Sequence, residues 1–172
     1  MAAGKTYDQL FTTTLTAAVA SVTISSIPAT YTDLVLIVNG QTSLNDQYIR
    51  MQVGNGSADT GSNYSYTNVI GYSGGAISQR GSSVAYCQIA ANSSNTVPGT
   101  YIAHLMNYAN TTTYKTVLSR GNNVGTVSVT DSHVSLWRST AAINIVKVFP
   151  STSVATDFSI GTTFTLYGIV AA

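Results

Sequence analysis

Charge is the scarcest property of this sequence. Glutamate is absent, and seven Lys or Arg residues with six Asp residues bring the charged fraction to 8%, whereas soluble domains typically carry about 25%. The formal net charge is +1, and a net charge near zero promotes association between molecules. Serine, threonine, asparagine, glycine and tyrosine take the place of the missing charges. This composition favours a protein that packs against copies of itself or against polar partners over a freely diffusing enzyme.

The few basic residues and the short apolar runs exclude two classes of partner. The basic residues are scattered singly along the chain, and binding of nucleic acid requires a cluster that neutralises several phosphates. The longest strongly apolar run, residues 34–38, is far too short to span a membrane. No apolar segment of a secretion signal is present near the N-terminus. We therefore expect no nucleic-acid partner, no membrane partner, and synthesis in the cytoplasm of the cell that makes the protein.

Cysteine is equally scarce, because Cys87 is the only one. A single cysteine excludes an intramolecular disulfide and any metal site built from several cysteines. It lies in an alternating apolar segment, and free cysteines of this kind are usually buried. We predict a buried, unreactive thiol.

No residues occur at a spacing that indicates catalysis. The six aspartates form no local pair of the kind that glycosidases use, and the serines form no nucleophile elbow. His104 and His133 lie within expected strands, where we predict structural roles for both. The sequence therefore predicts no catalytic, cofactor-binding or metal-binding residue, and no enzyme.

Alternation of apolar and polar residues with a period of two recurs along the chain, and no helical period extends over three turns. Such alternation predicts an all-β protein, an antiparallel β-sandwich of jelly-roll type with 8–10 strands. Residues 121–123 are expected to form a hairpin turn, and residues 54–63 a loop. We expect an N-terminal arm at residues 1–14 and one domain at residues 15–172. Residues 64–72 are expected to form either a strand or an ordered loop. The other expected strands cover residues 17–24, 33–39, 47–53, 82–90, 100–108, 114–120, 126–137, 143–149 and 162–170.

Five segments carry a family resemblance, in the same order along the chain. They are SSIPATYTDLVL (25–36), TGSNYSY (60–66), NYANTTTYK (107–115), LWRSTAAIN (136–144) and GTTFTLYGI (161–169). Together they resemble small virion structural proteins of tailed bacteriophages, including phages of cyanobacteria. The resemblance spans most of the chain and brings no catalytic residues with it.

The resemblance implies a location on the outer surface of the virion, and it leaves two roles open. The first is a capsid decoration (cement) protein that stabilises the shell as a homo-oligomer, expected to be a homotrimer. Its partners would be its own copies and the major capsid protein or another virion protein. The alternative is a tail fibre or tail-tip domain that recognises a glycan on the host surface.

Six residues are candidates for the interface. Leu10 and Phe11 lie in the expected arm, where they could bury apolar surface on a neighbouring molecule. Tyr64 and Tyr66 lie in or beside expected loops, and tyrosine suits both sugar stacking and protein interfaces. Trp137 and Arg138 combine a large anchor with a forked donor, a pair favoured at interface centres, although a core tryptophan beside a solvated arginine explains the pair equally well.

Overall fold

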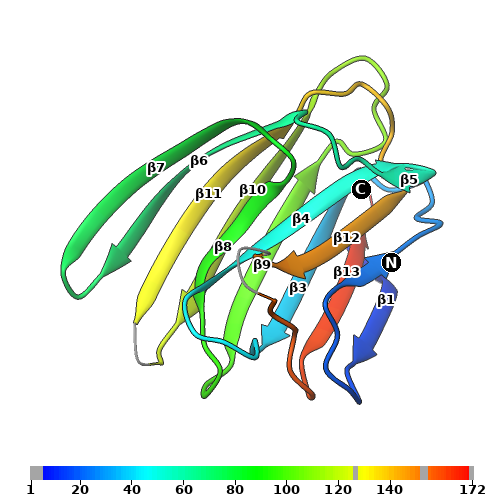
Figure 1. Ribbon diagram of the computed structural model, residues 1–172. Helices are drawn as coiled ribbons and strands as arrows, with labels where there is room; N and C mark the ends of the chain where they lie inside the picture. The colour runs from blue at the N-terminus through cyan, green and yellow to red at the C-terminus, as the bar shows by residue number, and fades with distance from the viewer. Residues whose placement is uncertain (1–5, 126–127, 152–154, 171–172) are drawn as a thin grey trace.

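The protein is a sandwich of two antiparallel β-sheets (Figure 1). The computed structural model describes residues 6–125, 128–151 and 155–170, and within these ranges it contains strands and no α-helix. The β-sandwich predicted from the alternation is thereby confirmed, whereas the jelly-roll subtype stays a prediction. Among the described residues, no helix is long and apolar enough to cross a membrane.

The larger sheet has eight strands. Figure 1 shows the β6–β7 hairpin at one side of this sheet and β1 at the other. In spatial order the strands are β1 (Tyr7–Thr14), β13 (Thr163–Ile169), β3 (Asp33–Gly40), β9 (Gly99–Met106), β10 (Lys115–Asn123), β11 (Val129–Trp137), β6 (Tyr64–Tyr72) and β7 (Gly75–Val84).

The smaller sheet covers part of one face of the larger sheet (Figure 1). Strand β8 (Cys87–Ser93) of the smaller sheet pairs with β4 and packs against β10 and β11 of the larger sheet. The other strands of the smaller sheet, in spatial order, are β2 (Val22–Ile24), β12 (Ile145–Pro150), β4 (Gln47–Asn55) and β5 (Ser57–Ala58).

The core lies between the two sheets. The nearly continuous apolar run of β3 places Leu34, Leu36 and Val38 against this core, each fully buried. Phe158 and Phe164 meet edge to face, with ring centroids 4.9 Å apart. Every second residue of a strand faces the same side, and this spacing aligns the apolar side chains of neighbouring strands.

The predicted arm is wrong for residues 7–14, which form edge strand β1. This strand pairs with β13 from Tyr7 to Thr14, with a bulge between Gln9 and Phe11. Backbone hydrogen bonding to β13 and packing on the core hold the segment within its own domain. Residues 1–5 lie outside the described residues.

Four further expectations about local structure are corrected. The strand expected at residues 17–24 is reduced to β2 and an isolated bridge between Val19 and Phe158. The strand expected at residues 82–90 is divided between β7 and β8. Ser83, near the end of β7, adopts a φ of +55°, a conformation that interrupts a regular strand. The turn expected at residues 121–123 lies within β10, which continues to Asn123. The expected loop at residues 54–63 contains the short strand β5.

Cys87 is fully buried, as predicted. Burial raises the pKa of its thiol to about 12, and the thiolate is the reactive form of cysteine. We therefore expect iodoacetamide to leave the native protein unlabelled at about pH 8 and to label it fully in guanidinium chloride, as measured by intact mass. Rapid labelling of the native protein would contradict the burial of this side chain.

Candidate interaction surface

Two of the predicted interface residues belong to the core, so the prediction is wrong for them. The side chains of Tyr64 and Trp137 are buried and stack with ring centroids 6.5 Å apart. The Tyr64 hydroxyl donates to the backbone carbonyls of Val53 and Asp59, over 3.0 and 2.8 Å. Neither ring is available to a partner.

Leu10 and Phe11 are also engaged within the chain, because both are partly buried and pack on the core between the sheets. For the part of their surface that remains exposed, contact with a neighbouring molecule stays a prediction. Arg138 is half-buried, and its guanidinium donates to the carbonyl of Ser62 over 2.7 Å.

Tyr66 lies in an aromatic stack on the inner side of the β6–β7 hairpin. Its ring centroid lies 6.2 Å from that of Tyr86, and the guanidinium of Arg50 lies 3.9 Å from the Tyr86 centroid. For Tyr66 and Arg138, which remain half-exposed, a role at an interface stays a prediction.

The loop beside Trp137 is organised by Asp59. Its carboxylate accepts hydrogen bonds from Trp137 Nε1 (2.7 Å), Asn63 Nδ2 (2.9 Å) and the Gly61 backbone N–H (2.8 Å). Burial acts to raise the pKa of Asp59, but these three donors outweigh it and leave the pKa below its ordinary value of 3.8. The polar turn that the sequence indicates at residues 59–63 is confirmed.

Replacing Asp59 with alanine should lower the free energy of unfolding by about 1–2 kcal/mol at neutral pH, because buried Trp137 loses its acceptor. The folded-state pKa of Asp59 is depressed, so its ionised carboxylate adds to the free energy of unfolding at every pH above the ordinary value of 3.8. This stabilisation is lost as the pH falls through the folded-state pKa. The stability gap between wild type and D59A, measured by urea unfolding, should therefore narrow under acid conditions. D157A is the control, since the Asp157 carboxylate has no hydrogen bond among the described residues.

In the middle of strand β11, polar side chains face the interior and Val134 faces solvent, whereas Val129 and Trp137 at the two ends of the inward face are buried. Asp131, His133 and Ser135 are 5%, 1% and 1% exposed, whereas Val134 between them is 43% exposed. Half-buried antiparallel strands normally show the opposite arrangement, with apolar residues towards the core.

Each of the two strands beside β11 shows this inversion at one position, since Val117 of β10 and Tyr64 and Ile70 of β6 are buried on the inward faces. On β10, Ser119 is buried and Leu118 is 40% exposed. On β6, Asn68 is buried and Val69 is 56% exposed. The register places Ser119 opposite His133, and His133 opposite Asn68, so the inward polar residues form one row across three strands.

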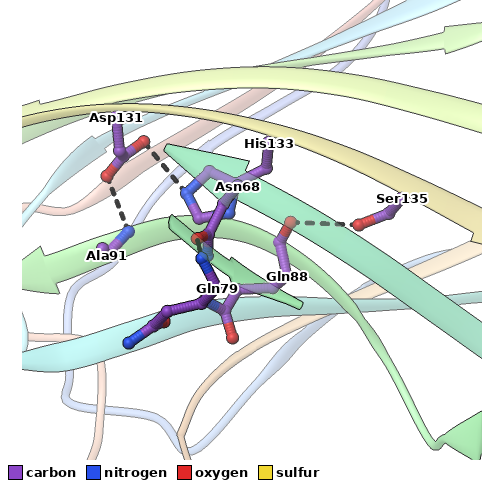
Figure 2. Close-up of polar contacts among 7 residues, drawn as sticks. All are labelled: Asn68, Gln79, Gln88, Ala91, Asp131, His133 and Ser135. Atoms are coloured by element: carbon purple, nitrogen blue, oxygen red, sulfur yellow. Dashed lines mark hydrogen bonds and ion pairs between the residues drawn. The ribbon is translucent and has the colours of Figure 1, made fainter. Parts of the chain in front are cut away.

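We call the inward residues Asn68, Ser119, Asp131, His133 and Ser135, with Gln88 of β8, the polar layer. Figure 2 shows most of its members between β8 and the larger sheet. Asp131 Oδ2 accepts from the backbone N–H of Ala91 over 2.7 Å, and Asp131 Oδ1 lies 3.2 Å from His133 Nε2. The Ser135 hydroxyl donates to the Gln88 carbonyl over 3.2 Å. The layer thus connects β8 to the larger sheet by polar contacts.

Only some of the hydrogen-bonding groups in the polar layer have a partner. Among the described residues, Asn68 Nδ2, Gln88 Nε2, Ser119 Oγ and His133 Nδ1 are buried without a hydrogen-bond partner. A buried unpaired group costs about 1–3 kcal/mol, so this arrangement is unfavourable for the isolated domain. If a partner covered the opposite side of these strands, it would bury the apolar side chains that the inversion exposes. The free energy gained from that burial would offset the cost of the unpaired polar groups.

The outer face of the larger sheet carries two shallow depressions. The first, of about 320 Å³, lies over β3, β9, β10 and β11, and the second, of about 460 Å³, lies over β6, β7 and β11. The first is lined by Tyr7, Val35, Ile102, His104, Leu118, Ser119, Arg120 and Ser132, and the second by Ser65, Tyr66, Thr67, Arg80, Gly81, Ser82, Val134 and Leu136. We call this side of β6, β7, β9, β10 and β11 the outer face.

The histidines are held by aspartates, in line with their predicted structural roles. His104 Nε2 on the outer face lies 3.0 Å from Asp33 Oδ2, and the second oxygen of Asp33 accepts from the Asn107 backbone N–H over 2.6 Å. His133 is held by Asp131 in the polar layer.

Within the described residues, no three His, Cys or Asp side chains gather as a metal-binding group. The arrangement that stands out is a surface for contact, namely the outer face, and of the six sequence-based candidates only Tyr66 lines one of its depressions. The chain matches no model of a known protein family and no curated protein.

Proposed function

We propose that this protein is a virion structural protein that acts by binding alone, as a capsid decoration protein on the outer surface of a phage shell. The observation that carries the proposal is the inversion of β6, β10 and β11, which exposes Val69, Leu118 and Val134. Contiguous exposed apolar surface marks interaction sites in soluble proteins. The low charge of the chain supports the same role.

In this proposal the copies associate as a closed homotrimer, because identical chains commonly assemble with cyclic symmetry. The outer face contacts the major capsid protein or another virion protein. No catalysis is needed, since the contribution to the shell comes from the surface that each copy buries.

A second candidate is a tail fibre or tail-tip domain that binds a host glycan. It is favoured by exposed Tyr7 and half-buried Tyr167, whose rings meet edge to face with centroids 6.0 Å apart. Tyr7 also lines the first depression, beside the polar groups of His104 and Arg120. An aromatic ring next to hydrogen-bonding groups suits a sugar as well as a protein.

The two candidates differ in the position and the copy number of the protein. Particles of the virus that encodes this chain should be purified, and the protein should be located by antibody labelling in electron micrographs. The proposal expects label over the whole shell and an amount comparable to that of the major shell protein. Label confined to the tail, in low copy number, would reject it in favour of the glycan-binding role.

A further inference from the structure

The outer face carries two free cations and no free anion in its β6, β7, β10 and β11 part. Arg80 on β7 and Arg120 on β10 are both exposed and line the second and the first depression. The only acidic residue of these four strands, Asp131, faces the interior. Among the described residues, neither arginine has a hydrogen bond or an ion pair.

The strand register fixes the spacing of the two arginines. Arg80 is opposite Thr67, Thr67 is opposite Val134, and Val134 is opposite Leu118, which lies two residues from Arg120 on the same strand. Three strand spacings and one two-residue step place the two Cα atoms roughly 16 Å apart. The apolar side chains of Leu118 and Val134 lie between them.

The extent of this surface matches a protein partner. Five strands about 4.8 Å apart and about 30 Å long present roughly 700 Å², and a standard protein interface buries about 800 Å² on each side. Between the arginines the surface is formed by aliphatic side chains such as Leu118 and Val134, which favours the apolar centre of a protein interface over a sugar.

The charges also argue against a second copy that docks on the outer face by a two-fold contact. A two-fold contact places the same patch of both copies face to face, so the two arginines of one copy would meet a surface of the same sign. Juxtaposed like charges are a cost at an interface. Carboxylates, by contrast, bind guanidinium groups through paired hydrogen bonds.

We infer that the outer face binds a flat protein surface of another virion protein, apolar in its centre and carrying two carboxylates about as far apart as Arg80 and Arg120. This inference rests on the proposed function and names the chemistry of the partner. The aliphatic centre supplies most of the buried area, and the two arginines fix the orientation.

The test uses the full-length protein and undecorated shells of the virus that encodes it, with binding measured by co-sedimentation. We expect R120E to weaken binding about tenfold, because it replaces an attraction to a carboxylate with a repulsion. We expect R80E/R120E to weaken binding about a hundredfold, because the free-energy losses at two separate sites add. K147E is the matched control, because it changes the net charge as R120E does but lies on β12 of the smaller sheet. It should bind as wild type does. V134D, on the same face, tests the apolar centre without changing either arginine.

The outcomes separate the inference from the proposed function. If the wild-type protein fails to bind shells, the proposed function is rejected. If V134D loses binding while R80E/R120E binds as wild type does, the proposed function stands and the carboxylate-bearing partner is overturned. If R120E and V134D dissociate the homo-oligomer in native mass spectrometry, the occupant is a second copy, which also overturns the inference. If the wild-type protein binds purified host glycan and both R120E and V134D lose that binding, the occupant is a glycan, and the inference is likewise overturned.

Discussion

Replacing Asp131 with alanine is expected to lower the free energy of unfolding by about 1–3 kcal/mol, because the buried N–H of Ala91 loses its hydrogen-bond acceptor. The substitution removes the acceptor of the Ala91 N–H and the group that faces His133 Nε2. In a domain of this size each 1 kcal/mol corresponds to about 2–4 °C in Tm. Urea unfolding and calorimetry would measure both quantities.

Asp131→Asn is the matched control. Its amide oxygen can still accept from the Ala91 N–H, so we expect a smaller loss than for D131A. A loss below about 1 kcal/mol for D131A, the size of one ordinary hydrogen bond, would show that the polar layer does not connect β8 to the larger sheet as described.

The second large effect is expected on assembly. The double variant L118D/V134D replaces two side chains that are 40% and 43% exposed, so its stability should stay within about 0.5 kcal/mol of wild type. Its binding to undecorated shells should fall by about a hundredfold or more, because two adjacent charges are placed in the centre of an apolar contact. Co-sedimentation and urea unfolding would separate the two effects.

Ile160→Asp provides the control for this variant. Ile160 is 66% exposed and lies in the turn before β13, outside the outer face. It should bind shells as wild type does. Equal binding by I160D and L118D/V134D would mean that exposed apolar residues of the outer face have no special role.

Most strands of this fold could be predicted from the sequence, because alternation and β-branched residues are local signals. The expected strand at residues 33–39 lacks only the last residue of β3, and residues 64–72, expected as a strand or an ordered loop, form β6. Strand β1 was missed because its threonine-rich segment shows no clear alternation. The division between β7 and β8 depends on the backbone conformation of Ser83, for which serine gives no local signal.

The interaction surface could not be predicted in the same way, since alternation defines two faces of a strand without saying which of them is buried. In β11 the usual rule places Val134 inside, and the structure reverses it. One signal was present: Val129 and Trp137 share a face with Asp131 and His133, and both ends of that face are large and apolar. Tyr64 and Trp137 were taken for interface residues because composition cannot separate a core aromatic from an exposed one.

The central claim is that the outer face is covered in the assembled particle, and one labelling measurement tests it most directly. Because Cys87 is buried, Ser132→Cys provides a single reactive thiol at an exposed position between β10 and β6, and Thr23→Cys provides one on β2 of the smaller sheet. In the free protein a maleimide should label both. In decorated particles we expect the label at residue 132 to be lost and the label at residue 23 to persist. Equal labelling of residue 132 in free protein and particles would contradict the account.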